Sequence, residues 1–239
     1  MSHRHLRNSH IVFRVVRFVS NSSRSFTIFS PSSPITQFHV EKRGIRVFGI
    51  AESFKETDTT STLGGVVVRR DLIIDGFVFS DVAIKGNDST QKILSMFHSL
   101  KRNDINCIML DGLIISIYNI IDAEEIAAKT GVPVIAITFR PSVGLDQTLE
   151  RNFPHDSKQK LEQYRRLGQR EKILLRTGKS IYLRSWGIRS REAIVVVNSF
   201  TLQGAVPEPI RIAKLAARAT ARFSNTRLFS GTTSTLRRV

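Results

Sequence analysis

A carboxylate and a glycine, Asp111 and Gly112, follow directly after a short apolar run at residues 108–110. Such a run is typical of a buried strand in a parallel sheet, and open α/β sheets bind their ligands where these strands end. A second acid, Glu52, follows a similar apolar run at residues 45–50. Acids at strand ends are candidates for catalysis. The alternative for Asp111 is a plain turn, because Asp and Gly both favour turns.

The formal net charge of +16 is spread unevenly along the chain. Residues 45–150 hold ten basic and fourteen acidic side chains, whereas residues 151–191 hold twelve basic and three acidic ones. Metal-dependent chemistry on a phosphodiester needs this combination, since carboxylates hold cations and basic groups hold the backbone. A solvated basic helix gives the same count. The charge therefore leaves both a nucleic-acid partner and a wet surface open.

The composition argues against a membrane-spanning protein and against a small protein held together by disulfides. A chain of 239 residues with 41% hydrophobic side chains is long enough for one well-buried domain. No apolar stretch approaches the roughly 20 residues that cross a bilayer, so we expect no membrane insertion. The single cysteine, Cys107, lies in an apolar run and cannot form an intramolecular disulfide. We interpret it as a core residue in a reducing compartment, which predicts a cytoplasmic protein.

Both ends of the chain are basic and poor in acids. Residues 1–40 contain no Asp or Glu and are rich in Ser and Arg. This composition predicts a disordered extension over residues 1–43, with an organellar transit peptide or an upstream stretch from a misassigned start codon as alternatives. Residues 223–239 are rich in Ser, Thr and Arg and are predicted to be a disordered tail. The globular domain is expected over residues 44–222.

Hydrophobic patterning predicts the order of the elements in this domain. Strands are expected at residues 45–50, 64–69 and 72–79, with β character continuing at 82–85, then a helix at 91–100, a strand at 105–110, a helix at 122–129 and a strand at 132–138. The first three strands form an antiparallel meander, and the later alternation favours parallel pairing. This order is that of a ribonuclease H-like fold, an α/β mixed sheet with flanking helices.

The basic region after this alternation predicts further helices. Leucines and a tyrosine at near-helical spacing predict an amphipathic helix over residues 156–176, either a surface helix or a DNA clamp. Residues 181–186 predict a strand, and residues 193–200 a strand or the start of a helix. Pro209 opens a last helix at residues 210–222. Lys214, Arg218 and Arg222 fall on successive turns of this helix, where they could track a phosphate backbone or simply form its wet face.

Three aromatic residues accompany the basic side chains. Tyr164, Tyr182 and Trp186 could stack on a base extruded from a nucleic acid. Aromatic residues at such positions are more often core packing, so both interpretations stay open.

Four motifs together resemble one family. They are Ile-Arg-Val-Phe-Gly-Ile at residues 45–50, Leu-Asp-Gly at 110–112, Val-Pro-Val-Ile-Ala at 132–136 and Pro-Glu-Pro-Ile-Arg-Ile-Ala at 207–213. The resemblance is to the archaeal endonuclease dU family, which is similar to endonuclease V. It implies a ribonuclease H-like fold and a Mg²⁺- or Mn²⁺-dependent endonuclease that acts at deaminated bases, chiefly deoxyuridine, in DNA repair. The implied partner is DNA, with RNA as an alternative.

The resemblance also assigns roles to residues. It implies that Asp111 and Asp88 are catalytic and hold the metal, and that Arg140 lies near the scissile phosphate; Glu52 is the third catalytic and metal-binding residue that we predict. Arg140 could equally be an ordinary surface arginine. Where the family reads Gly-Ile-Asp-Asp, however, this chain has Ala51 followed by Glu52. Either Glu52 compensates for the missing aspartate, or the chain is a degenerate paralogue that binds nucleic acid without cutting it.

Overall fold

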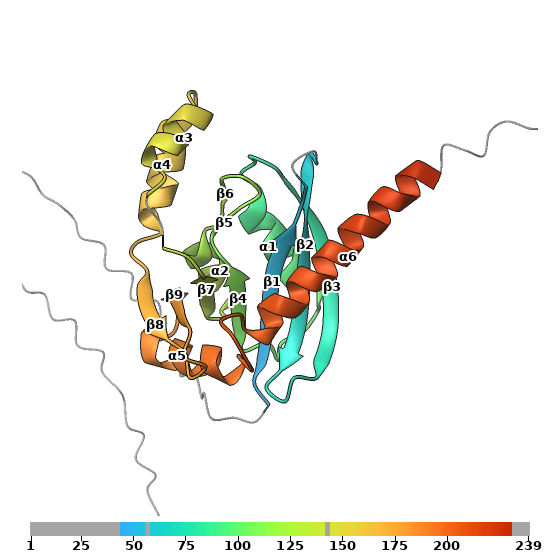
Figure 1. Ribbon diagram of the computed structural model, residues 1–239, viewed down its shortest axis with the longest axis vertical. Helices are drawn as coiled ribbons and strands as arrows, with labels where there is room; N and C mark the ends of the chain where they lie inside the picture. The colour runs from blue at the N-terminus through green and yellow to red at the C-terminus, as the bar shows by residue number, and fades with distance from the viewer. Residues whose placement is uncertain (1–43, 56–57, 142–143, 231–239) are drawn as a thin grey trace, which may run out of the picture. The chain divides into compact units, whose positions relative to one another are not determined.

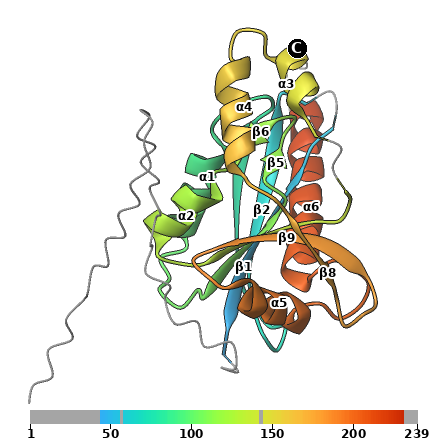
Figure 2. The same ribbon diagram turned by 90° about the vertical axis from the view of Figure 1, so that its left-hand side faces the viewer.

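The computed structural model describes residues 44–55, 58–141 and 144–230, and it describes side chains up to residue 223. A seven-stranded sheet runs through this region, with helices on both of its faces (Figures 1 and 2). The predicted extension at residues 1–43 lies outside the described residues.

The strands and helices alternate as the hydrophobic pattern predicts. The strands are β1 (Arg46–Ser53), β2 (Thr60–Arg69), β3 (Ile74–Ala83), β4 (Cys107–Asp111), β5 (Ile114–Ile115), β6 (Asn119–Ile120), β7 (Val134–Thr138), β8 (Glu171–Leu174) and β9 (Ser180–Trp186). The helices are α1 (Ser89–Ser99), α2 (Ala123–Thr130), α3 (Asp146–Asn152), α4 (Ser157–Arg166), α5 (Ser190–Ser199) and α6 (Glu208–Ser230).

The sheet combines antiparallel and parallel pairs in the order β3-β2-β1-β4-β7-β9-β8. β1, β2 and β3 form the antiparallel meander, and β1, β4 and β7 are parallel. β9 and β8 then add two antiparallel strands at the far edge. β5 and β6 form a separate small hairpin. The predicted mixed sheet with a three-strand meander is confirmed.

The central strands are apolar on both faces because helices cover both. Phe48 and Ile108 pack into the core beneath α1 and α2 on one face. Val47 and Met109, which alternate with them, pack into the second core beneath α5 and α6. Parallel strands that are buried on both sides read as continuous apolar runs, and this is the pattern at residues 108–110.

The helix α6 approaches β1 and β2 closely because two glycines leave room for it (Figure 1). A Cβ atom on Gly49 would lie 2.5 Å from the backbone carbon of Pro209, and one on Gly64 would lie 2.5 Å from the backbone oxygen of Ala213. Ala213 and Ala217 face the sheet with no exposed surface. Small residues on both sides therefore fix the position of α6, the helix that carries Lys214.

Several predicted elements need correction. The helix expected over residues 156–176 ends at Arg166, and the chain then turns at Gly168 into strand β8. Residues 193–200 belong mainly to the helix α5 and not to a strand. The last helix does not end at Arg222 but continues to Ser230, so residues 223–230 are helical and not a disordered tail. Helix α3 and the β5–β6 hairpin were not predicted.

Two expectations from composition can be compared with the structure. In the part of the chain that the structure describes, no helix is both long and apolar enough to cross a membrane. Cys107 is fully buried, as expected of a core residue, and burial raises the pKa of its thiol far above the ordinary value.

Candidate nucleic-acid site at the ends of the central strands

Asp111 is the last residue of β4 and points to the face of the sheet that α6 covers. Its Oδ2 accepts a hydrogen bond from Lys214 Nζ at 2.8 Å, and the two side chains are 14% and 49% exposed. Gly112 follows with φ +85°, a left-handed conformation that glycine adopts without strain. The dipeptide is therefore both a turn and the position of a partly exposed acid. Lys214, which was predicted to contact phosphate, pairs with this acid in the structure.

Ala51 occupies the position next to Asp111 on the neighbouring strand. Ile50 pairs with Leu110 in the parallel register, so the next residues, Ala51 and Asp111, lie side by side. Ala51 is 3% exposed and belongs to the core beneath α6. The place where a second carboxylate would face Asp111 is therefore filled by a methyl group.

Glu52 belongs to the opposite face of the sheet, since neighbouring residues on a strand alternate. Its carboxylate accepts hydrogen bonds from Ser61 Oγ at 2.8 Å, from Ser116 Oγ at 2.7 Å and from the Ser116 amide at 2.9 Å. Ser61 and Ser116 are fully buried. The acid therefore connects β1 to β2 and to the β5–β6 hairpin.

The turn of that hairpin is strained. Ser116, Ile117 and Tyr118 have φ values of 46°, 54° and 69°, a left-handed run that is unfavourable for residues with a Cβ and most of all for a β-branched one. Such a conformation persists only where surrounding contacts hold it. Glu52 holds Ser116, and the buried Lys160 donates from Nζ to the carbonyl oxygen of Tyr118 at 2.8 Å. Burial also lowers the pKa of Lys160.

Glu52→Ala is expected to lower the free energy of unfolding by about 3 kcal/mol, because it leaves three donors of the buried Ser61 and Ser116 unpaired. Urea unfolding followed by circular dichroism measures this loss. The matched control is Glu124→Ala on the exposed surface of α2, which is expected to change stability by less than about 0.5 kcal/mol. Equal losses in the two variants would show that Glu52 does not hold the hairpin.

Asp88 also makes local contacts that fix the chain before α1. Its Oδ1 accepts a hydrogen bond from Asn119 Nδ2 at 2.7 Å, and both carboxylate oxygens lie 3.3 Å from the Ala83 amide. Asp88 is the N-cap residue of α1, but its side chain does not bond the helix amides.

The structure does not bring the three acids predicted to hold a metal into one cluster, although Glu52 and Asp111 line the same small pocket at the strand ends. Among the described residues, no group of three or more Asp, Glu, His or Cys side chains is placed to hold a metal ion. Asp111 is paired with Lys214, whereas Glu52 and Asp88 are bonded to hydroxyl and amide groups on the other face. The physical reason is that neighbouring side chains on a strand point to opposite faces of the sheet. Glu52 therefore does not lie where an acid at residue 51 would lie.

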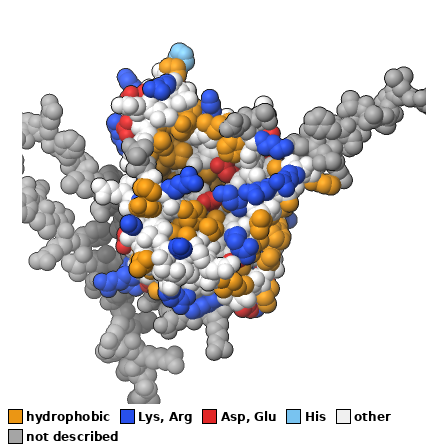
Figure 3. Space-filling view, viewed as in Figure 1, with side chains coloured by type: hydrophobic (Ala, Val, Ile, Leu, Met, Phe, Trp, Pro, Cys, Tyr) orange, Lys and Arg blue, Asp and Glu red, His pale blue; other side chains and the backbone are white. Residues whose placement is uncertain are grey.

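Basic side chains line the exposed side of α6. Lys214, Arg218 and Arg222 are exposed at intervals of one turn, and Figure 3 shows Lys and Arg side chains in a row along this helix. Arg140, after β7, is exposed, and its carbonyl oxygen accepts a hydrogen bond from Arg170 Nη1 at 3.1 Å. That these four residues contact nucleic acid stays a prediction.

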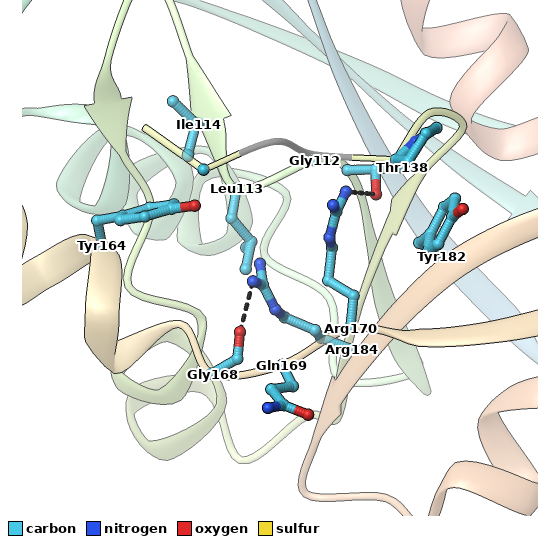
Figure 4. Close-up of a pocket in the computed structure, with 12 residues that line it drawn as sticks. Gly112, Leu113, Ile114, Thr138, Tyr164, Gly168, Gln169, Arg170, Tyr182 and Arg184 are labelled. Carbon is cyan, nitrogen blue, oxygen red and sulfur yellow. Dashed lines mark hydrogen bonds between the residues drawn. The ribbon is translucent and has the colours of Figure 1, made fainter. Parts of the chain in front are cut away.

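A pocket of about 420 Å³ lies beside Gly112. Arg170 and Arg184 project into it, and Tyr164 and Tyr182 also line it (Figure 4). Sequence reasoning missed Arg170 because it placed residue 170 in a helix, and it did not single out Arg184 on the predicted strand at residues 181–186. The alternation on β9 was the available signal: Ile181 and Leu183 are buried, so Tyr182 and Arg184 must face the other way.

The remaining aromatic residue, Trp186, is half-buried and packs against the core beneath α1 and α2. Tyr164 packs against the same core while lining the pocket. For Trp186, core packing is therefore the interpretation that the contacts favour.

Comparison with known proteins bears on this geometry. Residues 43–221 match the model of a family described as endonuclease dU. The chain belongs to this family. A UPF0215 protein of the archaeon Pyrobaculum calidifontis is 36% identical over 168 residues, which is 70% of this chain and 92% of that protein. The resemblance found in the four sequence motifs is thus confirmed.

Solved structures share the fold of this endonuclease dU family member. A protein of unknown function from Archaeoglobus fulgidus aligns with a TM-score of 0.62 and 26% identity, covering 74% of this chain and 98% of that one. Endonuclease V of Ciona intestinalis, in complex with DNA that contains an inosine, aligns with a TM-score of 0.50 and 15% identity over 75% and 87% of the two chains. The fold is ribonuclease H-like, as predicted.

Proposed function

We propose that this chain acts on DNA as an endonuclease at deaminated bases, chiefly deoxyuridine, and serves in DNA repair. Membership of the endonuclease dU family and the endonuclease V fold support a nuclease that acts on DNA. The observation that carries the proposal is the Asp111–Lys214 pair, which is partly exposed at the end of a central strand between basic α6 and the arginine-lined pocket. The preference for deoxyuridine follows from the family description alone.

The residues around Asp111 do not fit the Mg²⁺ or Mn²⁺ ion that we expected from the sequence. These ions take oxygen ligands and are usually held by more than one acidic group or by an acid together with substrate. Here the carboxylate faces an ammonium group 2.8 Å away, and its neighbour on β1 is Ala51. While Lys214 is paired with Asp111, its positive charge at this distance opposes the binding of a divalent cation. The proposed mechanism therefore takes no step through a metal ion.

Asp111 and Lys214 together can still act on a phosphodiester. Lys214 is half-exposed and can turn from Asp111 to a phosphate oxygen, where its charge neutralises the charge that develops during attack. Asp111 can then accept a proton from a water molecule as the water oxygen bonds to phosphorus. The bond from phosphorus to the 3′ oxygen breaks, that oxygen takes a proton from solvent, and the phosphate remains as a 5′-phosphate on the other strand end.

A second candidate function is DNA binding without cleavage. The observation that favours it is the methyl group of Ala51 beside Asp111, together with the ion pair that neutralises the one remaining acid. Under this alternative the basic side chains on α6 bind the backbone, and affinity falls steeply with added salt.

A nicking assay separates the two functions. Labelled duplex and single-stranded DNA containing one deoxyuridine or one deoxyinosine is incubated with wild type, Asp111→Ala and the control Glu124→Ala, in EDTA, Mg²⁺ or Mn²⁺. We expect wild type and Glu124→Ala to cut at deoxyuridine even in EDTA, and Asp111→Ala to be slower by about 100-fold.

Other outcomes assign the function differently. Binding that weakens with salt, without cutting under any condition, would establish the second candidate. Cutting that requires Mg²⁺ or Mn²⁺ would show that a metal site forms when DNA binds and that the assignment to Asp111 and Lys214 alone is wrong. Cutting only at deoxyinosine would overturn the proposed base preference.

A further inference from the structure

Two guanidinium groups, those of Arg170 and Arg184, lie in one pocket, and no carboxylate of the described residues pairs with either of them. The pocket is lined from four elements, by Gly112 after β4, Thr138 at the end of β7, Tyr164 on α4, and Tyr182 and Arg184 on β9, with Arg170 in the connection to β8. Figure 4 shows both arginines reaching into it, with the two tyrosines on opposite sides. Among the described residues, neither arginine forms a salt bridge.

The hydrogen bonds of these arginines hold them in place without neutralising them. Arg170 Nη1 donates to Thr138 Oγ1 at 2.9 Å, and its guanidinium lies 5.0 Å from the centre of the Tyr182 ring. Arg184 Nη2 donates to the carbonyl oxygen of Gly168 at 2.6 Å. These partners are neutral, so the guanidinium groups keep both positive charges.

Arg184 carries the clearest sign of a missing partner. Its Nε atom is buried and has no hydrogen-bond partner among the residues that the structure describes. Burial, and after it the charge of Arg170, lowers the pKa of Arg184. A buried donor and two like charges are unfavourable unless something pairs with them. An anion between the two guanidinium groups would satisfy the donor and relieve the repulsion.

The volume of the pocket and the residues that line it indicate which class of anion it can bind. A volume of about 420 Å³ is that of a small-molecule site and exceeds what a lone phosphate needs. Tyr164 and Tyr182 offer aromatic surface to a planar ring, and Gln169 offers an amide that can both donate and accept. Two guanidinium groups match a phosphomonoester, which carries a charge of about −1.5 to −2 at pH 7, better than a diester with a single charge.

We propose that this pocket binds a nucleoside monophosphate, with the phosphate between Arg170 and Arg184 and the base against the tyrosines. The ligand is either a free nucleotide or the terminal nucleotide of a DNA strand that carries a 5′-phosphate. The free nucleotide needs no nuclease activity, whereas the strand end rests on the proposed function, because an endonuclease creates such ends beside Asp111.

Calorimetry with free nucleotide tests the site itself. Wild type is titrated with dUMP, deoxyuridine and inorganic phosphate. We expect dUMP to bind at least about tenfold more tightly than either of the others, since only dUMP supplies both the anion and the ring. Arg184→Gln and Arg170→Gln should each weaken dUMP binding by about tenfold or more.

Two variants test whether weaker dUMP binding could arise from the loss of a positive charge alone or from a loss of folding. Arg191→Gln removes the same charge from the exposed surface of α5 and should leave dUMP binding unchanged. Arg184→Lys keeps the charge and most of the length but loses the fork of donors, so it should bind dUMP with intermediate affinity and melt at nearly the temperature of wild type. Equal affinity of wild type for dUMP and deoxyuridine, or binding unaffected at both arginines, would overturn the proposal.

Competition against dUMP identifies the source of the nucleotide. An eight-residue oligonucleotide with a 5′-phosphate should displace dUMP if strand ends occupy the pocket, and the same oligonucleotide with a 5′-hydroxyl should not. Displacement by neither oligonucleotide assigns the pocket to free nucleotides. If wild type does not cut DNA in the nicking assay, we still expect it to bind dUMP. The proposed function and the proposed nucleotide pocket can therefore fail separately.

Discussion

Ala51→Asp combined with Lys214→Ala is expected to create a Mn²⁺ site beside Asp111, where the described part of the wild-type chain shows no cluster of three metal-binding side chains. The register of β1 and β4 places residue 51 beside Asp111, on the face that α6 covers. The double substitution therefore puts two carboxylates side by side and removes the ammonium group that now occupies Asp111. Carboxylate oxygens are suitable ligands for Mn²⁺ and Mg²⁺. Calorimetry should show Mn²⁺ binding at least about tenfold tighter than to wild type.

The matched control replaces Ala51 by Asn in the Lys214→Ala background. Asparagine has nearly the size of aspartate but no negative charge, so this variant should bind Mn²⁺ less tightly than the double variant, and the difference measures the effect of the second carboxylate. Ala51→Asp alone should bind less tightly than the double variant, because Lys214 then lies among the carboxylates. We do not expect wild type to bind Mn²⁺ tightly, because the residues around Asp111 do not fit a metal ion. Tight stoichiometric binding of Mn²⁺ by wild type that disappears in Asp111→Ala would contradict that conclusion.

Gly64→Ala is expected to lower the free energy of unfolding by about 3 kcal/mol, because the added methyl group meets backbone that cannot rotate away. The new Cβ would lie 2.5 Å from the carbonyl oxygen of Ala213 and 3.0 Å from the amide nitrogen of Ala217, both on α6. The helix must shift outward, and the shift also moves Lys214 away from Asp111. Urea denaturation measures the loss through the midpoint of unfolding.

Gly76→Ala on the neighbouring strand is the control for this substitution. A Cβ at residue 76 would have no atom within 4 Å, and the glycine does not have a left-handed conformation. Its replacement should leave stability unchanged or raise it slightly, since alanine restricts the unfolded chain. If both variants unfold at the same urea concentration as wild type, α6 does not pack against β2 as described.

Much of the fold follows from periodicity alone. The continuous apolar run at residues 108–110 predicted a strand buried on both faces, and β4 is such a strand. Gly131 ends α2 in a left-handed conformation, as expected of a helix C-terminus. Asp111 was predicted to stand at the end of a central strand, and it does.

Elements that depend on distant contacts were not predicted. The left-handed turn at Ser116, Ile117 and Tyr118 is unfavourable locally and exists because Glu52 and Lys160 hold it. Helical spacing over residues 156–176 was misleading because Leu174 belongs to a strand that pairs with β9. Arg170 and Arg184 meet in one pocket because of that strand pairing. Their proximity was therefore not predicted while residue 170 was placed in a helix.

The ion pair at the end of β4 has a consequence for turnover. With Lys214 bonded to Asp111, the two opposite charges cancel, so the reaction centre proposed above is locally neutral. A phosphate that draws Lys214 away uncovers the carboxylate, whose negative charge then repels the same phosphate. In the mechanism proposed above, Lys214 is thus shared between two competing anions once Asp111 has lost the proton that it took from water. The proposed enzyme would then exchange counter-ions at each cycle, and its own acid would favour release of the nicked strand.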